Sequence, residues 1–375
     1  MQKFTVDTST FKSMVNKASK GAGKNKTKTL TEYMFVQISD GVLSLTTTDI
    51  NNYLTISEHI DCQENVYFVV DLDKFSKLVS KQTSKQITFE ADEALTIKGN
   101  GKYTLDLKFD SDGESQIKLP KHEINMPEES GRISLRTIQG IIAYNKMSLA
   151  ILDTQRPYLA GYCCGAGQVI SSDGINMTVN SVDTFKKRVL VSPTMLELLL
   201  ISKDDSLSYK IYEDKVLFES DTFKLYGVFM PLDWVEDYPV DTVNRLCQLQ
   251  YASSCTVQKS AVLGAIDRLS LLYSDLEEWS IIIKFDKDAM ILTTNNGKGS
   301  ERIQYQGTNN HVDYMCKMLV PHLKNIISAR DGETVHILYG TDAVDDPTNM
   351  SAKTITIRED DIVQVSALKQ LKGSG

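Results

Sequence analysis

The stretch VVDLDKFSKLVS at residues 69–80 returns twice along the chain, as LVSPTMLELLLIS at 190–202 and as LVPHLKNIISA at 319–329. Each copy opens on apolar residues and continues with apolar residues at helical spacing, as Phe75 and Val79 do in the first copy. The copies lie about 125 residues apart, which is one third of a chain of 375 residues. A unit that repeats at this period predicts three equivalent modules rather than one large core.

A second helix pattern precedes each of these stretches. In its first copy, apolar residues at 11, 14, 15 and 18 follow the spacing of a buried helix stripe. Alternating strand-like segments follow each helix, and the dipeptide Asp40-Gly41 between two of them is a strong hairpin signal. We predict an α+β fold of three tandem modules at residues 1–125, 126–247 and 248–375, with the earlier helices near 11–20, 138–149 and 261–272.

Composition narrows the class of protein. Hydrophobic residues make up 41% and charged residues 24%, as in a soluble globular protein. No apolar run approaches the roughly 20 residues of a membrane helix, and the N-terminal segment has no apolar signal core. The six cysteines are scattered and form no C-x-x-C pair, so we expect reduced thiols and a cytoplasmic location. The net charge of −8 requires any contact with nucleic acid to be local.

No sequence motif singles out residues for catalysis, although a general acid and base need not be adjacent in sequence and could lie among the 49 Asp and Glu residues. GAGKNK at 21–26 is not a phosphate-binding loop, because Asn25 stands where that motif needs Ser or Thr and no glycine lies five residues before Gly23. We predict no catalytic residue, no metal and no cofactor. A DNA- or nucleotide-processing enzyme is a disfavoured alternative. The five histidines have no metal-ligand spacing: His59, His122, His311, His322 and His336.

Lysines gather on the two helices expected in the first module. The ordinary interpretation is a solvated helix face, but two such helices in an acidic chain also suit contact with phosphates, which is independent of base sequence and weakened by salt. Aromatic residues are absent from this face, which favours a duplex over stacked single strands. The lysines are Lys17, Lys20, Lys24, Lys74, Lys77 and Lys81.

Several motifs, in order, resemble those of a known family. DGVLSLTTTDINN at 40–52 is similar to a D-G-x-L-x-L-x-x-T-D signature, and RPYLAG at 156–161 to R-x-x-L-x-G. VEDYP at 235–239 stands where that family has Phe-Pro-Asp-Tyr, and AIDRLSLL at 265–272 resembles a helix of its third module. The chain resembles the bacterial replicative sliding clamp, the beta subunit of the DNA polymerase holoenzyme, over nearly its whole length. Its divergence suits a phage or plasmid version.

The resemblance implies a function without chemistry. Two chains would associate head to tail as a homodimer and close a ring of six modules, with helices lining the hole and sheets outside. The ring would encircle duplex DNA and tether a DNA polymerase as a processivity factor, after loading by a clamp loader. It implies no membrane contact. The alternative is a clamp-fold protein that binds partners without encircling DNA.

The resemblance also implies site residues. Those facing DNA would lie on the two helices of each module, and the later modules are less basic than the first. They are Lys17, Lys20, Lys24, Lys74, Lys77 and Lys81 in module one, Lys146 and Lys203 in module two, and Lys259, Arg268, Lys324 and Arg330 in module three.

Two contacts with other chains are implied as well. The dimer contact would set Tyr103 and Leu105 against Leu271 and Leu272, with ordinary core packing as the alternative interpretation. A pocket for a short peptide with apolar anchors would lie between modules two and three. The family's T-D-G-H-R-L segment is matched to VDTFKKRV at 182–189, and its V-M-P-M-R tail to VSALK, so weaker binding of the usual peptide is expected. The pocket residues are Leu159, Asp183, Phe185, Lys186, Val365 and Leu368.

Overall fold

The computed structural model describes residues 2–23, 29–110, 113, 115–120, 126–151, 155–274, 276–310, 314–330, 332–340, 353–359 and 361–368. Lys24 and the KGSG tail lie outside these ranges. The chain forms two compact units, one of Met1–Ile138 with Thr194–Phe229 and the other of Gln139–Pro193 with Met230–Gly375. The middle third of the sequence is therefore shared between the units. The three module boundaries remain a prediction.

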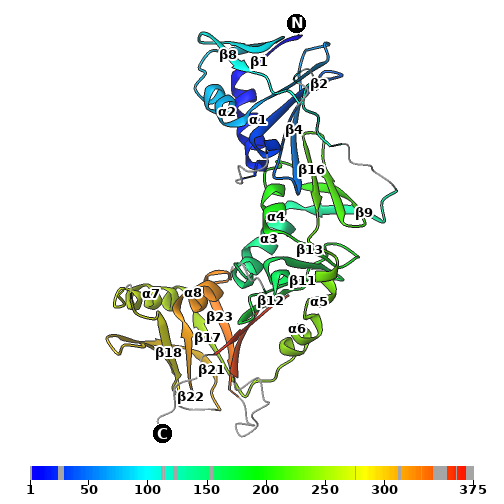
Figure 1. Ribbon diagram of the computed structural model, residues 1–375. Helices are drawn as coiled ribbons and strands as arrows, with labels where there is room; N and C mark the ends of the chain where they lie inside the picture. The colour runs from blue at the N-terminus through cyan, green and yellow to red at the C-terminus, as the bar shows by residue number, and fades with distance from the viewer. Residues whose placement is uncertain are drawn as a thin grey trace. The chain divides into compact units, whose positions relative to one another are not determined.

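The order of elements repeats three times (Figure 1). The first repeat runs β1 (Gln2–Asp7), α1 (Thr8–Ala18), β2 (Tyr33–Ser39), β3 (Val42–Thr48), β4 (Asn52–His59), β5 (Val66–Asp71), α2 (Leu72–Ser80), β6 (Gln86–Ala91), β7 (Ala94–Lys98) and β8 (Lys102–Asp106). The second runs β9 (Glu129–Ser134), α3 (Leu135–Asn145), β10 (Tyr162–Gly165), β11 (Gln168–Ser172), β12 (Asn176–Asn180), β13 (Val189–Val191), α4 (Pro193–Leu199), β14 (Ser206–Tyr212), β15 (Lys215–Glu219) and β16 (Phe223–Val228).

The third repeat follows the short helices α5 (Asp233–Asp237) and α6 (Val240–Cys247). It runs β17 (Ser253–Gln258), α7 (Lys259–Ser270), β18 (Ser280–Phe285), β19 (Ala289–Thr294), β20 (Ser300–Gln304), β21 (Gln306–Thr308), β22 (Tyr314–Leu319), α8 (Val320–Ser328), β23 (Thr334–Tyr339), β24 (Thr354–Glu359) and β25 (Ile362–Ala367). Short 3-10 turns occur at Ser19–Gly21, Thr29–Glu32, Lys146–Ser148 and Pro157–Ala160. Helices thus form at all six predicted places, and the α+β prediction is confirmed.

Every repeat pairs its strands in the same way. With the strands of a repeat counted from one to eight, and β21 set aside as an addition, the fifth, second, third and fourth lie side by side. The first, sixth, seventh and eighth form the other group. All pairings within these groups are antiparallel. The sequence pattern of hairpins is therefore realised three times over.

Neighbouring repeats share sheets. β4, the fourth strand of the first repeat, pairs antiparallel with β16, the eighth strand of the second, and creates an eight-stranded sheet. β12 pairs with β25 by the same rule and creates a nine-stranded sheet that includes β21. The eight-stranded sheet lies wholly in the first unit and the nine-stranded sheet wholly in the second. The equivalent strands at the two ends of the series, β8 and β20, each pair with one described strand only.

Aromatic packing fixes the helices of the first repeat on their sheet. Phe11 of α1 and Phe75 of α2 meet edge to face, with ring centroids 6.0 Å apart. Phe11 also lies 4.8 Å from Phe89 of β6, and Phe4 of β1 stacks on Phe89 at the same distance. All four side chains are buried. The predicted apolar stripe of α1 is therefore its core face.

The predicted hairpin at Asp40-Gly41 is confirmed. It joins β2 to β3, and both residues have positive φ, 53° for Asp40 and 73° for Gly41. Two successive positive φ values are the geometry of the tightest hairpin turn, which explains the Asp-Gly pair. Among the described residues no helix is long and apolar enough to cross a membrane.

Candidate functional sites

The helix pair α1 and α2 presents the predicted lysine face. Asp7 caps α1 by accepting the Thr10 N–H at 2.9 Å, and Asp71 caps α2 by accepting the Lys74 N–H at 2.8 Å. Each carboxylate thus lies at the start of its helix, where the helix dipole favours negative charge. The last turns contain no acid and carry Lys17 and Lys77. The two helices pack side by side (Figure 1).

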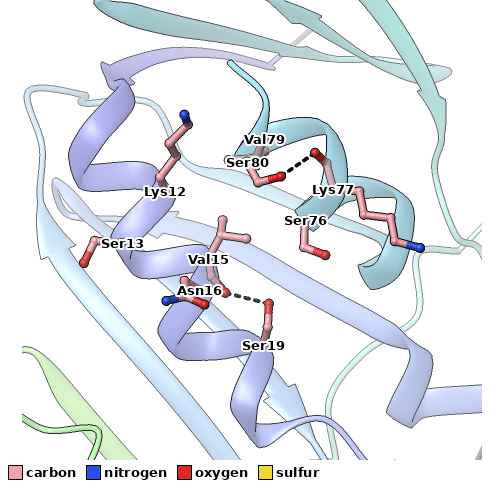
Figure 2. A pocket seen from close by; sticks show the side chains of 9 residues that line it. All are labelled: Lys12, Ser13, Val15, Asn16, Ser19, Ser76, Lys77, Val79 and Ser80. Carbon is pink, nitrogen blue, oxygen red and sulfur yellow. Dashed lines mark hydrogen bonds between the residues drawn. The ribbon is translucent and has the colours of Figure 1, made fainter. Parts of the chain in front are cut away.

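A groove of about 520 Å³ runs between these helices (Figure 2). Polar residues make up most of its lining, and two of its serines turn their hydroxyls back onto their own helices: Ser19 Oγ donates to the Val15 carbonyl at 2.6 Å and Ser80 Oγ to the Lys77 carbonyl at 2.7 Å. The lysine and asparagine side chains of this lining can contact water or phosphate oxygens. The groove is lined by Lys12, Ser13, Val15, Asn16, Ser19, Ser76, Lys77, Val79 and Ser80.

The lysines of this face carry little compensating charge. Lys20, Lys74 and Lys81 are exposed, and no described residue forms an ion pair with them. Lys77 pairs with Asp73 at 2.7 Å, but both side chains are about three-quarters exposed, 74% and 73%, so water screens the pair strongly. The face thus keeps most of its formal positive charge.

Lys17 and Lys203 meet although they are far apart in sequence. Both line a pocket of about 340 Å³ in the first unit, together with Ser9, Ser13 and Glu58 among others. Burial lowers the pKa of Lys17 below its ordinary value, and the nearby positive charge of Lys203 lowers it further, against the opposing charges of Asp204 and Glu58. A lysine from the second repeat therefore extends the charged surface of the first.

The corresponding cations of the third repeat have partners inside the module. Arg268 of α7 donates two hydrogen bonds to the Glu301 carboxylate, at 2.8 and 2.6 Å, and these bonds raise the pKa of Arg268 and lower that of Glu301. Lys324 of α8 pairs with Asp267 at 2.6 Å, and because these side chains are 49% and 59% exposed, water screens this pair in part. Lys259 donates to the uncharged backbone carbonyl of Arg330 and keeps its charge. Two of the predicted cations on these helices therefore lie beside a carboxylate.

Arg330 departs from its predicted place on the DNA-facing surface. Its side chain is only 2% exposed, and its guanidinium donates to the Ile357 carbonyl and to Gln364 Oε1 at 3.2 Å. In the repeat, Ile326 and Ile327 correspond to Leu78 and Val79, so Arg330 corresponds to Gln82, which is also 2% exposed. The prediction treated Arg330 as a helix-face cation, whereas it is a core residue that cannot reach a phosphate.

The predicted dimer residues lie at the surface rather than in a core. Leu271 is 82% exposed and Leu272 is 38% exposed, immediately after α7 and near β20. Tyr103 and Leu105 are half-buried on the edge strand β8, opposite Ile97 and Leu95 of β7, and so share one face of the strand. Ordinary core packing therefore does not account for the two leucines.

Only part of the predicted peptide pocket comes together. Leu159 and Val365 are buried in one cluster with Met177 and Val243. Leu368 packs instead against the core of the third repeat.

Asp183, Phe185 and Lys186 lie elsewhere. The Phe185 carbonyl accepts the Ala166 N–H at 3.2 Å, which places this segment at the turn between β10 and β11. The turn between β11 and β12, which borders the groove described next, is at the opposite end of β11. The match of VDTFKKRV to the family segment therefore assigned Asp183, Phe185 and Lys186 to the pocket, although they lie apart from Leu159 and Val365.

The turn between β11 and β12 borders a groove in the second unit. The groove has a volume of about 840 Å³, and exposed apolar side chains line it beside the buried Leu159 and Val365 cluster. Asp173-Gly174 is the same turn signal as Asp40-Gly41, and SDGINM at 172–177 also carries the Asp-Gly of T-D-G-H-R-L. That dipeptide was the signal that could have found the site. The lining residues are Lys146, Met147, Leu149, Ala150, Ile151, Gln155, Asp173, Ile175, Pro321, His322 and Asn325.

Metal-ligand clusters and reactive thiols are two further chemical features to consider. The described ranges contain no group of three or more His, Cys, Asp or Glu side chains placed to hold a metal ion. All six cysteines are free, and burial raises the pKa of the Cys163 thiol to about 11 and of the Cys316 thiol to about 12. These two thiols stay protonated at neutral pH and are poor nucleophiles.

Comparison with known proteins identifies the fold. No protein-family model matches the chain, and no curated protein sequence matches it. Solved structures do: the DNA polymerase III subunit beta from Pseudomonas aeruginosa is similar with a TM-score of 0.82 at 15% identity, and the DNA polymerase beta subunit of Streptococcus pyogenes with 0.83 at 14%. A putative DNA polymerase III beta subunit from Eubacterium rectale gives 0.82 at 18%. Each match covers 99% of this chain and 100% of the other. The chain therefore has the sliding-clamp fold over its full length.

Proposed function

We propose that this protein is a DNA sliding clamp: two copies close head to tail into a ring that encircles duplex DNA and tethers a replicative DNA polymerase. The fold of polymerase beta subunits supports this proposal. The observation that carries it is the pairing rule between repeats. The fourth strand of one repeat pairs with the eighth strand of the next, in β4 with β16 and in β12 with β25.

The same rule leaves two strand edges for a second copy. The fourth strand of the last repeat is β20 and the eighth strand of the first is β8, and each has one edge without a partner strand among the described residues. An exposed strand edge is a template for pairing with another chain. If β20 of each copy pairs with β8 of the other, two chains close a ring, and the exposed Leu271 and Leu272 meet Tyr103 and Leu105 at the joint.

The charge distribution suits a ring that slides. The chain has a net charge of −8, whereas the α1 and α2 face concentrates lysines that lack strong partners. Lysine contacts with phosphates are independent of base sequence, so the duplex is attracted without being held in one register. We include Lys17, Lys20, Lys74, Lys77, Lys81 and Lys203 in this surface and leave Arg330 out, while Lys24, outside the described residues, stays a prediction from the sequence.

Tethering would use the groove beside Ile175. A concave apolar site with a few polar groups suits a short peptide from a polymerase or a clamp loader. A polymerase that lets go of its template then stays at a high effective concentration beside it, which is the physical basis of processivity. In this proposal the protein is a cytoplasmic, non-catalytic accessory factor that needs no cofactor.

Two measurements test the proposal. Sedimentation should give a mass of about twice 42.0 kDa at micromolar concentration. Protein retained on a nicked circular plasmid in high salt should be released when the plasmid is cut once, because a ring slides off an end. A monomer that binds peptides but is never retained on circular DNA would favour the alternative, a partner-binding protein that does not encircle DNA.

A further inference from the structure

The groove beside Ile175 has a polar rim, whose hydrogen bonds determine which groups can act as donors or acceptors toward a ligand. Its floor is apolar, with Met147, Leu149 and Ile175 among its side chains. Its one acid among the described lining residues is Asp173, and His322 lies across from it at the start of α8. The roles of these two groups decide what the rim can recognise.

Asp173 is held by its own turn. Its Oδ1 accepts the N–H groups of Ile175 at 2.8 Å and of Asn176 at 2.6 Å. Its Oδ2 accepts Asn176 Nδ2 at 2.9 Å. Three hydrogen bonds therefore fix the carboxylate in the turn, and Oδ2 keeps capacity for one more donor.

The same bonds fix the orientation of the buried Asn176 amide. A carboxylate can only accept, so the amide nitrogen must face Asp173. The amide oxygen then faces Ser366, whose Oγ donates to it at 2.6 Å. The opposite orientation would set two oxygens against each other at the Asp173 side.

The Asn176 amide in turn fixes the tautomer of His322. The second hydrogen of Asn176 Nδ2 points to His322 Nδ1, 3.0 Å away. Nδ1 must therefore accept, which leaves the ring proton on Nε2. No described residue forms a hydrogen bond with Nε2. The neutral ring is thus held with an N–H donor on the edge that turns away from Asn176.

We infer that His322 uses its Nε2–H to recognise a hydrogen-bond acceptor on the peptide that binds in this groove, beside the peptide's apolar anchors. This inference rests on the proposed function. The acceptor is a side-chain carboxylate or a backbone carbonyl. Lys146, on the same rim, and the N-terminus of α8 add positive potential there, against the negative charge of Asp173, and the peptide series below distinguishes the two acceptors. His322 is therefore a specificity-determining residue of the groove.

The test compares two substitutions of His322. His322→Phe keeps the ring bulk but removes the donor, whereas His322→Gln places an amide N–H near the position of Nε2. The probes are three hexapeptides that carry two leucines and differ at one intervening position, which is Asp, Asn or Ala. Calorimetry measures their affinities for each protein at pH 8, and long-range ¹H–¹⁵N NMR reads the tautomer of His322 in the wild type.

We expect His322→Phe to weaken binding of the Asp peptide about tenfold or more, the effect of losing a hydrogen bond to a charged group, and His322→Gln to restore most of it. Weakening confined to the Asp peptide identifies a carboxylate, and equal weakening of all three identifies a backbone carbonyl. Unchanged affinities in His322→Phe, or a proton on Nδ1, would overturn the inference about His322 but not the proposal that the groove binds a peptide. If no peptide binds the wild type, the proposed groove falls and the inference falls with it.

Discussion

The helix pairs of the first and third repeats are built alike and charged differently. Both pairs pack side by side on their sheets and both carry cations at predicted positions. On α1 and α2 the lysines point to solvent, with one exposed partner, Asp73. On α7 and α8 Arg268 and Lys324 are bound to Glu301 and Asp267, and nearby Arg330 is buried.

This difference teaches that the number of cations on a helix does not determine the electrostatic potential at its surface. An ion pair within the module weakens the attraction felt by a phosphate, because the carboxylate repels what the cation attracts, and the two effects approach cancellation as the phosphate lies farther away than the separation of the pair. In the proposed ring, the first repeat of each copy would adjoin the third repeat of the other. A strongly basic surface would then lie beside a weakly basic one at each of the two joints of the ring.

The largest effect is expected from separating the two repeats at that joint. Leu271→Ala with Leu272→Ala removes the apolar contact proposed between β20 and β8, at a cost of about 2–5 kcal/mol for each side chain if it is fully buried there. The dimer dissociation constant should rise at least 100-fold, measured by sedimentation. Leu200→Ala, at another exposed leucine, is the control. A double variant that stays dimeric at micromolar concentration, with an unchanged circular dichroism spectrum, would place the interface elsewhere.

A smaller effect distinguishes a buried cation from an exposed one. Arg330→Ala leaves Gln364 Oε1 and the Ile357 carbonyl without their donor and opens a cavity, so we expect a loss of about 2–4 kcal/mol in the free energy of unfolding. Lys81→Ala, at an exposed position, should change it by less than about 0.5 kcal/mol. Denaturant unfolding measures both. Equal, small changes would mean that Arg330 is not held as described.

Matched removal of charge tests the comparison itself. Lys20→Gln, Lys74→Gln and Lys81→Gln together should lower the slope of log affinity against log salt by roughly 2–3, since each lost phosphate contact removes about 0.9. The matched triple in the third repeat, Lys259→Gln, Arg268→Gln and Lys324→Gln, should lower it by less than about 1. Fluorescence anisotropy with a short duplex measures both. Similar slopes for the two triples would contradict the difference between the repeats.

The smallest effect is a gain. Asp267→Asn with Glu301→Gln removes the partners of Lys324 and Arg268 and frees both cations. We expect the salt slope to steepen by roughly 1 and the affinity for duplex DNA to rise a few-fold at low salt. Asp73→Asn is the control, because Lys77 is already screened by water. A double variant that binds no better than the wild type would show that the third repeat does not face DNA.

Local patterns in the sequence determined the architecture. The spacing of Phe11, Met14 and Val15 located the core face of α1, and Asp40-Gly41 located a hairpin, because helical period and turn geometry are properties of a few neighbouring residues. The threefold recurrence of these patterns gave the order of elements. The two leucines after α7 are exposed, and their part in a dimer contact stays a prediction of the family resemblance.

Tertiary structure alone decided which of the predicted residues share a surface. Helical spacing cannot tell that Arg330 falls on the buried position of Gln82, or that Glu301 of β20 reaches Arg268 of α7. It cannot bring Lys203 to Lys17, or set His322 against Asn176. These are contacts across more than 30 residues of sequence, and they depend on how strands and helices pack. The sequence supplied the charges and the turns, and packing determined which charges remain unpaired and which turns border a groove.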